Sequence, residues 1–486
     1  MSKKKHPAPT AWEIAKCIVY TILYLAFLYW IGTWWGLIVV PFLIDAYITK
    51  RIPWTWWKDS KNPIVYTVMS WIDALTFALV AVYFVNVYFF QNYTIPSSSL
   101  EKSLLVGDYL FVSKMSYGPR KPQTPLHMPL CQHTLPLDLG KSYLEKPQWE
   151  YERVTPKPVG LNDIVVFNYP AGDTIFTSQP YQTEYYSICY SLGRQLYEQR
   201  FGCQPPVQAL TPLQRYQLFQ QLYAAGRAYA VQYGTDLGQI DWRPVDRREN
   251  YVKRCVGLPG QMLEIRDGAI YLDGTLNPDG PHVQHNYQVE TVGQRESITD
   301  FAVEMGISME DLHDFYGSGI LPLALDVKAA MEARTDLVKS ITREPQAFTS
   351  DLLYPQNGYT GWTCDNYGPL WIPAKGQSID LTLENLPLYE RPIRVYEGNE
   401  LDVTADGRIL INGEETTSYT FRMDYYWMQG DNRHKSADSR FWGFVPEDHV
   451  VGKPLFVWLS VNKDATFFSP HHFRWKRMFR TVESLI

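Results

Sequence analysis

Two long apolar stretches occupy the first part of the chain. The first covers residues 12–48 and the second covers residues 65–90. About 20 apolar residues cross a bilayer as a helix, so the second stretch predicts one membrane span. The first stretch is long for one span, and Gly32 and Gly36 could break it into a hairpin of two short spans; a single over-long helix is the alternative. Residues 1–92 are therefore predicted to form a membrane anchor with two or three transmembrane helices.

Basic residues between the two stretches indicate how the anchor is oriented. The segment carries four of them, at Lys50, Arg51, Lys58 and Lys61. An excess of lysine and arginine marks a loop on the cytoplasmic side of a membrane. The second stretch then carries the chain outward, and we expect residues 93–486 to form an outer domain.

Beyond residue 100 the pattern takes on the short period of β-strands. Residues 108–113 (DYLFVS), 163–168 (DIVVFN) and 251–256 are β-branched and aromatic runs bounded by turn residues. The sequence DGAIYLDG predicts a hairpin within residues 262–272. Strands are expected again over residues 394–412. The fold class predicted for the outer domain is mainly β.

Two partly helical insertions are expected in this β domain, at about residues 173–250 and 277–391. In the first, Thr211 followed by Pro212 indicates the start of a helix that runs to about Tyr233. In the second, Ser308 and Asp311 have the spacing of a capping box before a short helix. Residues 326–339 predict another helix.

Composition and motifs exclude several classes of function. The net charge of −6 gives no basic footprint for a nucleic acid. HExxH, a Walker A loop, GxGxxG and paired CxxC motifs are absent from the sequence, which argues against a metal- or nucleotide-driven enzyme. Cys189 and Cys203 could be bridged in an oxidising compartment, and free thiols are the alternative.

Candidate chemistry begins with three serines that follow Pro96, where the second apolar stretch ends. A serine nucleophile needs a base, and the nearest downstream histidines, His127 and His133, lie in a proline-rich loop. Lys253 and Arg254, in a predicted strand, point to opposite faces, so one of them must face inward or lie at an edge. An inward lysine loses hydration, which lowers its pKa and lets the neutral amine accept a proton. A strand with two solvated charges is the alternative.

A third cluster of polar residues lies at residues 430–443 (GDNRHKSADSRFWG). Its alternate positions Ser436, Asp438 and Arg440 place a hydroxyl, a carboxylate and a guanidinium on one side of an extended segment. That arrangement suits a hydrogen-bonded support for a buried amine. An ordinary polar loop is the alternative.

Four segments follow one another in order after the second apolar stretch: residues 95–99 (IPSSS), 161–167 (LNDIVVF), 251–260 (YVKRCVGLPG) and 430–440 (GDNRHKSADSR). Together they resemble the boxes of bacterial type I signal peptidases, the membrane-bound serine proteases with a Ser-Lys dyad. The resemblance covers the second span and part of the outer domain, and both insertions fall outside it.

The resemblance implies a role for each matched residue. Ser99 would be the nucleophile and Lys253 the general base, while the Ser97 hydroxyl and the Ser99 backbone N–H would form the oxyanion hole. The Ser436 hydroxyl would hold the Lys253 amine in place. Asp438 and Arg440 would form a structural ion pair behind the dyad. Shallow apolar pockets for the substrate would be lined by Ile95, Pro96, Leu100, Leu104, Tyr251 and Val252. Leu100 stands where the family usually has methionine, a change that keeps the pocket floor apolar.

The function implied is that of signal peptidase I, a serine endopeptidase that cleaves N-terminal signal peptides from exported preproteins after small-x-small sites. No cofactor is expected. The partners would be exported preproteins and the lipid bilayer, with no nucleic acid. The protein would lie in the bacterial inner membrane as a multi-pass protein with its catalytic domain on the periplasmic side.

Two other functions are compatible with the sequence. One is a Ser-Lys protease with a narrower set of substrates, and the other is an inactive, membrane-tethered binding protein that retains the fold. The joint presence of Ser99, Lys253 and Ser436 argues against the inactive protein. Residues 467–479 mix aromatic and basic side chains, which predicts docking on the bilayer surface, with core packing as the alternative.

Overall fold

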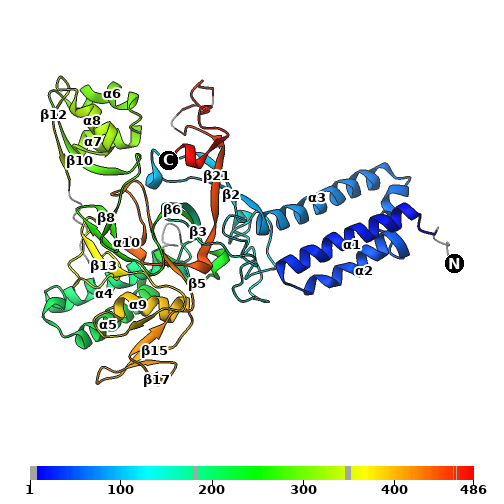
Figure 1. Ribbon diagram of the computed structural model, residues 1–486, viewed down its shortest axis with the longest axis horizontal. Helices are drawn as coiled ribbons and strands as arrows, with labels where there is room; N and C mark the ends of the chain where they lie inside the picture. Colours follow the sequence, from blue (N-terminus) through cyan, green and yellow to red (C-terminus); the bar gives the residue numbers. More distant parts are fainter. Residues whose placement is uncertain (1–7, 179–183, 345–351, 464, 467) are drawn as a thin grey trace.

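The computed structural model describes residues 8–178, 184–344, 352–463, 465–466 and 468–486. A rod of helices formed by the N-terminal part of the chain projects from a wide, β-rich body (Figure 1). The rod contains α1 (Ala11–Ile31), α2 (Val40–Ile44) and α3 (Pro63–Tyr88). The architecture is mainly β with apolar helices at the N-terminus.

The first apolar stretch folds back on itself. α1 begins with a capping box in which Thr10 accepts a hydrogen bond from the Glu13 N–H, and it ends at Gly32, whose φ of 65° is left-handed. A second arm, residues 35–49, returns along α1, so that Tyr24 Oη donates to the Gly36 carbonyl at 2.8 Å and Lys50 pairs with Glu13. The alternative of one over-long helix is therefore wrong, because the left-handed turn at Gly32 stops it.

Two helices of the described chain, α1 and α3, are long and apolar enough to cross a membrane. The returning arm is shorter, and its 15 residues span about 22 Å at 1.5 Å per residue. α3 has 26 residues and starts with Asn62 as its N-cap and Pro63 at its first position. Only Phe89 separates the end of α3 from the first strand.

An eight-stranded antiparallel sheet forms the centre of the body. Its order is β1-β2-β21-β3-β6-β19-β20, and β22 pairs with β21. The strands are β1 (Phe90–Thr94), β2 (Asp108–Ser113), β3 (Ile164–Asn168), β6 (Asn250–Gly257), β19 (Tyr425–Gln429), β20 (Val445–Pro446), β21 (Val450–Ser460) and β22 (Arg480–Thr481). The strands predicted at residues 108–113, 163–168 and 251–256 are confirmed. β6 lies between β3 and β19, which places the centre of the candidate chemistry in the middle of the sheet.

A second sheet, of four strands, packs against the first, and the two sheets share one hydrophobic core. It contains β7 (Met262–Arg266), β8 (Ala269–Leu272), β9 (Thr275–Asn277) and β13 (Tyr367–Trp371). The predicted hairpin is β7–β8, with positive φ at Asp267 and Gly268. The shared core is built from large buried side chains that include Tyr367, Tyr425 and Trp427.

Smaller ribbons and short helices complete this part of the body. They are α9 (Leu386–Arg391), α10 (Ser439–Trp442), β14 (Ser378–Asp380), β15 (Leu401–Val403), β16 (Ile409–Ile411), β17 (Glu414–Glu415) and β18 (Ser418–Thr420). The turn between β15 and β16 contains Gly407, whose φ is positive. The strand predicted to begin at residue 394 is wrong there, because the chain continues from α9 into a π-helical turn, Pro392–Tyr396, that buries Ile393.

The first insertion contains a helical pair that is closed by a short ribbon, β4 (Thr174–Phe176) with β5 (Ile240–Trp242). The helices are α4 (Tyr185–Phe201) and α5 (Pro212–Tyr233). Thr211 caps α5 as predicted. A Cβ at Gly226 would lie 1.9 Å from the Cys189 carbonyl oxygen, so glycine is what lets the two helices approach. Cys189 is buried in α4 and Cys203 is exposed beyond it, and both are free thiols.

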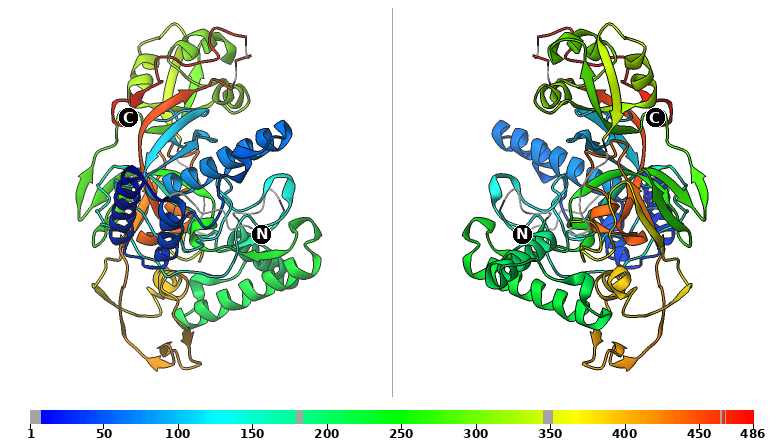
Figure 2. Two further views of the ribbon diagram at one scale, coloured as in Figure 1. Left: turned by 90° about the vertical axis from the view of Figure 1, so that its right-hand side faces the viewer. Right: turned by 90° about the vertical axis from the view of Figure 1, so that its left-hand side faces the viewer.

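The second insertion contains a lobe with its own core, residues 284–343. Its elements are β10 (Gln284–Thr291), α6 (Thr299–Glu304), α7 (Met309–Ser318), β11 (Ile320–Ala324), α8 (Leu325–Glu332) and β12 (Val338–Arg343). Ser308 caps α7 as predicted. Figure 2 shows this 284–343 lobe at one end of the body and the α4–α5 pair at the other.

The helix predicted over residues 326–339 is wrong in its second half. α8 ends at Glu332, and Val338 begins a strand that pairs with β10. Val338 is buried and Ile341 packs on the same core, and pairing with β10, with a register shift between Glu290 and Thr291, outweighs helix propensity here.

Candidate active site

Ser99 lies in a short 3₁₀ turn, Ser98–Leu100, directly after β1. The turn is fixed on both sides. Ile95 N donates to the Asp108 carbonyl at 2.9 Å, and Asn432 N donates to the Ser99 carbonyl at 3.1 Å. The buried side chains of Ile95 and Leu100 anchor the turn in the core between β2 and β3. The hydroxyl of Ser99 is thereby held at a defined position, although it lies outside a regular strand.

Lys253 reaches Ser99 from the middle of β6. Its side chain is 4% exposed, and Nζ donates a hydrogen bond to Ser99 Oγ at 2.7 Å. Strand pairing on both sides of β6 fixes the backbone, with Val165 of β3 directly opposite Lys253. The structure thus brings together the serine and the lysine that the sequence singled out.

Burial sets the protonation of this amine. Desolvation lowers the pKa of Lys253 to about 8, against the opposing effect of the carboxylates of Asp438 and Asp431. An ordinary lysine has a pKa near 10.5 and is almost never neutral at physiological pH. Lys253 is therefore an amine that gains or loses its proton close to neutral pH, as a general base requires.

Arg254, next to Lys253, is buried as well. Its guanidinium donates two hydrogen bonds of 2.7 Å to Asp431, on the opposite face of β6 from Lys253. Asp431 also accepts a 2.5 Å hydrogen bond from Ser103. We expected one of the two cations to face inward or lie at an edge, and in the structure both Lys253 and Arg254 are buried. Asp431 was not singled out from the sequence, and its only signal was a carboxylate inside the 430–443 cluster.

The 430–443 segment packs directly behind the dyad. Asp438 and Arg440 form a fully buried ion pair at 2.7 Å, and Asp438 also accepts a hydrogen bond from the Gly430 N–H. Gly430 itself lies against the serines: a Cβ there would be 2.3 Å from Ser436 Oγ and 2.5 Å from the Ser99 carbonyl oxygen. This close approach requires glycine at position 430.

Ser436 is placed differently from what the resemblance implies. Its Oγ is buried and has no hydrogen-bond partner among the described residues. The expected hydrogen bond to Lys253 is therefore not formed in this structure. Ser436 instead packs across Gly430 from Ser99, with a buried hydroxyl that is free to bond.

The cavity beside Ser99 has a volume of about 380 Å³. Its lining contains five of the six predicted substrate-binding residues, Ile95, Pro96, Leu100, Tyr251 and Val252. Leu104 is not among them, because it is completely buried in the core beneath with Leu110 and Val112. Ser97 also lines the cavity, and its Oγ lies 3.5 Å from Ser99 Oγ.

The sequence did not single out several other residues of the cavity, namely Tyr93, Val166, Asn250, Lys435 and Ala437. Strand register could have found some of them. Val166 lies directly opposite Val252 in the β3–β6 pair, so the two share a face of the sheet. The others depend on loops whose positions sequence patterns do not give.

The 284–343 lobe is attached on both sides of the candidate site. Lys102 donates to the carbonyls of Met305 and Gly306 at 2.8 and 2.5 Å. Lys435 donates to Asp311 and Asp314 at 2.8 and 2.7 Å. Lys102 follows Ser99 in sequence and Lys435 precedes Ser436, so these two attachments of the lobe flank the cavity.

One buried cluster has the composition of a metal site. Ligand atoms of His285, Asp365 and His434 lie within 4.8 Å of one another. Each ring nitrogen is already engaged: His434 accepts from Asn286 N and contacts Asp365, and His285 is bonded to Arg343 and Asp279. This arrangement fits a hydrogen-bonded network that ties the lobe to the 430–443 segment better than it fits a metal ligand set.

Comparison with known proteins agrees with this geometry. The family model described as signal peptidase, peptidase S26, matches residues 68–310 and 382–459, more than half of the chain. The match runs through the first expected insertion and leaves out residues 311–381 of the second.

Similar proteins come from several bacteria. The signal peptidase I of Haemophilus influenzae is 31% identical over 128 residues, which cover 23% of this chain and 36% of that protein. That of Helicobacter pylori strain J99 is 38% identical over 85 residues (16% and 29%), and that of Leptolyngbya laminosa 35% over 79 residues (14% and 38%). The aligned segments span between 29% and 38% of the length of these relatives. Because the family model covers more than half of the chain, including Ser99 and Lys253, the chain belongs to the signal peptidase family, peptidase S26.

Proposed function

We propose that this protein is a membrane-bound serine endopeptidase that removes N-terminal signal peptides from exported preproteins. One observation carries the proposal: the buried Lys253 amine, with a pKa lowered to about 8, lies 2.7 Å from the Ser99 hydroxyl. The proposed roles are nucleophile for Ser99 and general base for Lys253.

The placement of these groups supports the following reaction. The neutral Lys253 amine takes the proton of Ser99 Oγ as the oxygen attacks the scissile carbonyl. The negative charge of the tetrahedral intermediate is stabilised by the Ser97 hydroxyl and the Ser99 backbone N–H. The Lys253 ammonium then protonates the leaving amine, and the same lysine activates the water that hydrolyses the acyl-enzyme.

Three groups support the lysine through the cycle in this proposal. The buried Asp438–Arg440 pair supplies a fixed negative potential that partly offsets the desolvation of the ammonium. The unpartnered Ser436 hydroxyl accepts from the ammonium when it forms, which satisfies both buried groups.

The substrate is proposed to lie extended in the cavity beside Ser99. The walls contributed by Ile95, Leu100 and Val252 are apolar and close to the backbone, so they leave room for small side chains near the cleaved bond. An extended segment would pair with the exposed backbone of the cavity rim by β-augmentation. This supports cleavage after small-x-small sites.

The proposed location is the bacterial inner membrane, with residues 1–92 as a multi-pass anchor and residues 93–486 as the outer catalytic domain. Two apolar helices support the anchor, and the basic residues between them support a cytoplasmic connection. The two insertions, at about 173–250 and 277–391, are proposed to be additions to the catalytic β domain. The partners would be the preprotein and the bilayer.

Exposed aromatic side chains support contact of the outer domain with the bilayer. Phe468, Trp475 and Phe479 are 95%, 68% and 75% exposed, whereas Arg474 and Arg477 fold back onto the Val106 and Ser103 carbonyls. Phe467 of the predicted tail lies outside the described residues.

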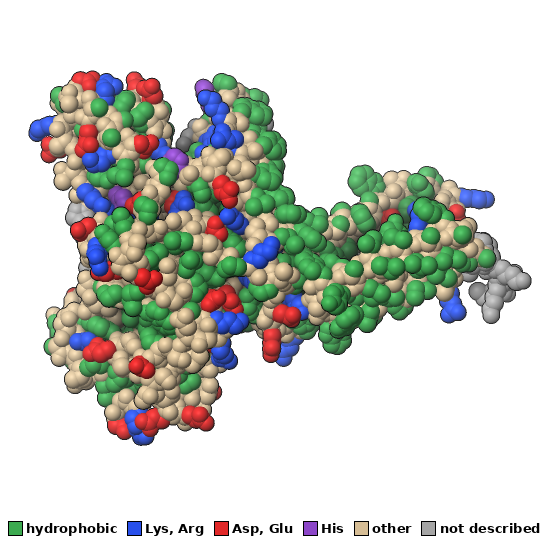
Figure 3. All heavy atoms as spheres, viewed as in Figure 1, with side chains coloured by type: hydrophobic (Ala, Val, Ile, Leu, Met, Phe, Trp, Pro, Cys, Tyr) green, Lys and Arg blue, Asp and Glu red, His purple; other side chains and the backbone are tan. Residues whose placement is uncertain are grey.

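A neighbouring stack of aromatic rings extends this surface over the strands next to the tail. Phe111 stacks on Phe90 and on Phe456 at ring distances of 4.7 and 4.8 Å. Hydrophobic side chains gather along this edge of the body, on the side from which the helical rod projects (Figure 3). We propose that the tail and this stack dock together on the membrane surface.

The test is cleavage of a preprotein by the full-length protein purified in detergent. Ser99→Ala and Lys253→Met should abolish cleavage, and Ser98→Ala is the matched control because it changes the adjacent serine of the same turn. Cleavage by the Ser99→Ala variant at the wild-type rate would overturn the proposal.

A further inference from the structure

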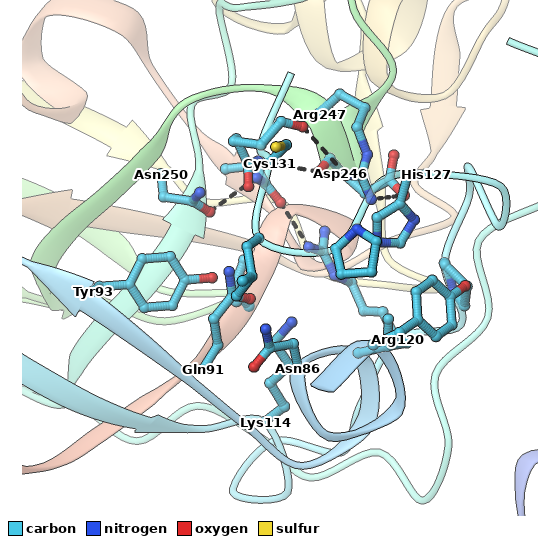
Figure 4. Close-up of a pocket in the computed structure, with 18 of the residues that line it drawn as sticks. Asn86, Gln91, Tyr93, Lys114, Arg120, His127, Cys131, Asp246, Arg247 and Asn250 are labelled. Atoms are coloured by element: carbon cyan, nitrogen blue, oxygen red, sulfur yellow. Dashed lines mark hydrogen bonds and ion pairs between the residues drawn. The ribbon is translucent and has the colours of Figure 1, made fainter. Parts of the chain in front are cut away.

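A second cavity, of about 270 Å³, lies where the helical rod meets the body. Its walls are formed mainly by the last turns of α3, strand β1, Lys114 just after β2, the loop around residues 120–132 and residues within 246–250. Figure 4 shows the residues that line it, among them Asn86, Gln91, Lys114, Arg120 and Arg247. It is separate from the cavity beside Ser99, and Tyr93 and Asn250 line both.

The lining is strongly basic. It contains four cations, Lys114, Arg120, Lys121 and Arg247, and a single carboxylate, that of Asp246. That carboxylate is occupied by Arg247 and by the Thr124 N–H and hydroxyl. Of the cations, Lys121 is neutralised by Glu152 at 2.5 Å. Positive charge at Lys114 and Arg120 therefore remains without a carboxylate in the cavity.

Lys114 is the exceptional member of this set. Its backbone N–H donates to the Phe89 carbonyl, but its ammonium has no hydrogen bond or ion pair anywhere in the described chain. Desolvation, with repulsion from Arg120 and Arg247, lowers the pKa of Lys114 to about 7. A desolvated ammonium without a partner is unfavourable, and a bound anion would satisfy it.

Neutral donors lie beside the lysine. The side-chain amides of Asn86 and Gln91 also have no hydrogen-bond partner among the described residues, and Figure 4 shows both of them close to Lys114 on one side of the cavity. Arg120 is held in place by its hydrogen bonds to Asn168 and to the Asp448 carbonyl. One ammonium and two free amides around a fixed guanidinium match the several acceptor oxygens of a phosphate group.

The cavity lies at the depth of lipid headgroups, a conclusion that rests on the membrane placement proposed above. The 26 residues of α3 extend about 39 Å, longer than the roughly 30 Å hydrocarbon core of a bilayer. Tyr83 and Asn86, in the last two turns of α3, therefore lie near the level at which the phosphates of the outer leaflet begin.

We propose that this cavity binds a phosphate ester, with Lys114 as its principal ligand and the headgroup of an anionic phospholipid as its source. The phosphate oxygens accept hydrogen bonds from Lys114, Asn86 and Gln91, and the acyl chains extend along α3. A bound headgroup thereby fixes the body against the membrane at the base of the rod.

The experiment uses full-length protein in a neutral detergent and measures binding by equilibrium dialysis and native mass spectrometry. The probes are dioctanoyl phosphatidylglycerol, sn-glycerol 3-phosphate, inorganic phosphate and, as an uncharged control, dioctanoylglycerol. We expect one phosphatidylglycerol per chain and no retention of dioctanoylglycerol. Binding of phosphatidylglycerol alone supports a headgroup site. Equal binding of glycerol 3-phosphate or inorganic phosphate supports the phosphate site and overturns its assignment to a lipid.

Variants locate the site. Lys114→Gln should weaken phosphatidylglycerol binding by at least about tenfold, because it removes a charge-assisted hydrogen bond to the phosphate. Lys114→Arg should restore binding, and Lys157→Gln, which removes an exposed cation elsewhere on the body, should leave it unchanged. Unaltered affinity in Lys114→Gln, or no binding of any phosphate compound, overturns the proposal.

The outcome is independent of the proposed protease activity. The Ser99→Ala variant should bind phosphatidylglycerol as the wild type does, and Lys114→Gln should cleave a short soluble peptide at the wild-type rate. Loss of peptide cleavage in Lys114→Gln with retained lipid binding would show that the lysine acts on the fold or the dyad, and would overturn its assignment as a phosphate ligand.

Discussion

Replacing Lys253 with methionine should make the protein more stable as it removes the proposed general base. Lowering the pKa of this lysine from 10.5 to about 8 means that burying its ammonium disfavours folding. At about 1.4 kcal/mol for each pKa unit, the penalty is of the order of 3 kcal/mol. Methionine has an unbranched side chain of similar length and no charge to desolvate.

The carboxylates near Lys253 keep their partners in this variant. Asp438 remains paired with Arg440, and Asp431 with Arg254, so the change leaves no buried acid unpaired. The Ser99 hydroxyl loses its donor, but it faces the cavity, where water can replace it. The expected net effect on the free energy of unfolding is a gain of up to about 3 kcal/mol, or about 3–6 °C in Tm for a chain of this size.

The gain depends on pH in a defined direction. Below pH 8 the lysine is protonated in both the folded and the unfolded protein, so the penalty is present in full. Between pH 8 and 10.5 the unfolded chain binds more protons, and wild-type stability rises with pH towards that of the variant. Above pH 10.5 the difference disappears.

The assay is thermal unfolding of the wild type and of Lys253→Met in the same detergent at several pH values from 6 to 10, with Ser98→Ala as a control. The difference in Tm should be largest at pH 6–7 and shrink steadily above pH 8. A variant that is less stable than the wild type at pH 7, or a difference that does not change with pH, would refute the reasoning that burial sets the protonation of this amine.

Three further predictions concern the site and the surface. The kcat/KM for a soluble peptide should rise about tenfold per pH unit and level off above pH 8, because only the neutral Lys253 amine is a base; a profile that is flat from pH 6 to 9 would contradict this. Gly430→Ala should lower kcat by about a hundredfold, because its Cβ would displace the Ser99 carbonyl or the Ser436 hydroxyl. The control is Gly280→Ala, whose Cβ meets nothing within 4 Å and which should leave kcat unchanged. Equal activity of the two variants would show that the site tolerates the shift. Replacing Phe473, Trp475 and Phe479 with serine should weaken binding of the outer domain to anionic vesicles and spare peptide cleavage, and unchanged vesicle binding with a lower Tm would place these rings in the core instead.

The sequence was most informative where local chemistry decides the structure. The start of α5 at Pro212 and the hairpin around Gly268 were predicted correctly, because caps and turns depend on neighbouring residues. Strand periodicity also placed Lys253 and Arg254 on opposite faces of β6. These features require no knowledge of distant parts of the chain.

Long-range packing decided the features that the sequence did not reveal. That Arg254 is buried follows from Asp431, which lies on another segment and meets it only in the folded sheet. Leu104 has an apolar side chain that would suit a pocket wall, yet the turn after Ser99 directs it into the core. The hydrogen bonds from Lys102 and Lys435 to the 284–343 lobe likewise join segments that no local pattern connects.

The junction between α3 and β1 has a further consequence. A single residue, Phe89, connects α3, the proposed span, to β1, so Ser99, the proposed nucleophile, follows that span without a long linker. The five residues of β1 extend at most about 17 Å, so in the proposed placement the chain can rise only about that far from α3 before the loop that carries Ser99. Under the proposed function, a preprotein anchored by its own apolar segment would present its cleavage site at a similar height. Since an extended chain advances about 3.3 Å per residue, the reach corresponds to about five residues beyond the apolar segment. A protein with the proposed function would thus select the bond that it cleaves by distance from the membrane as well as by the size of the side chains beside that bond.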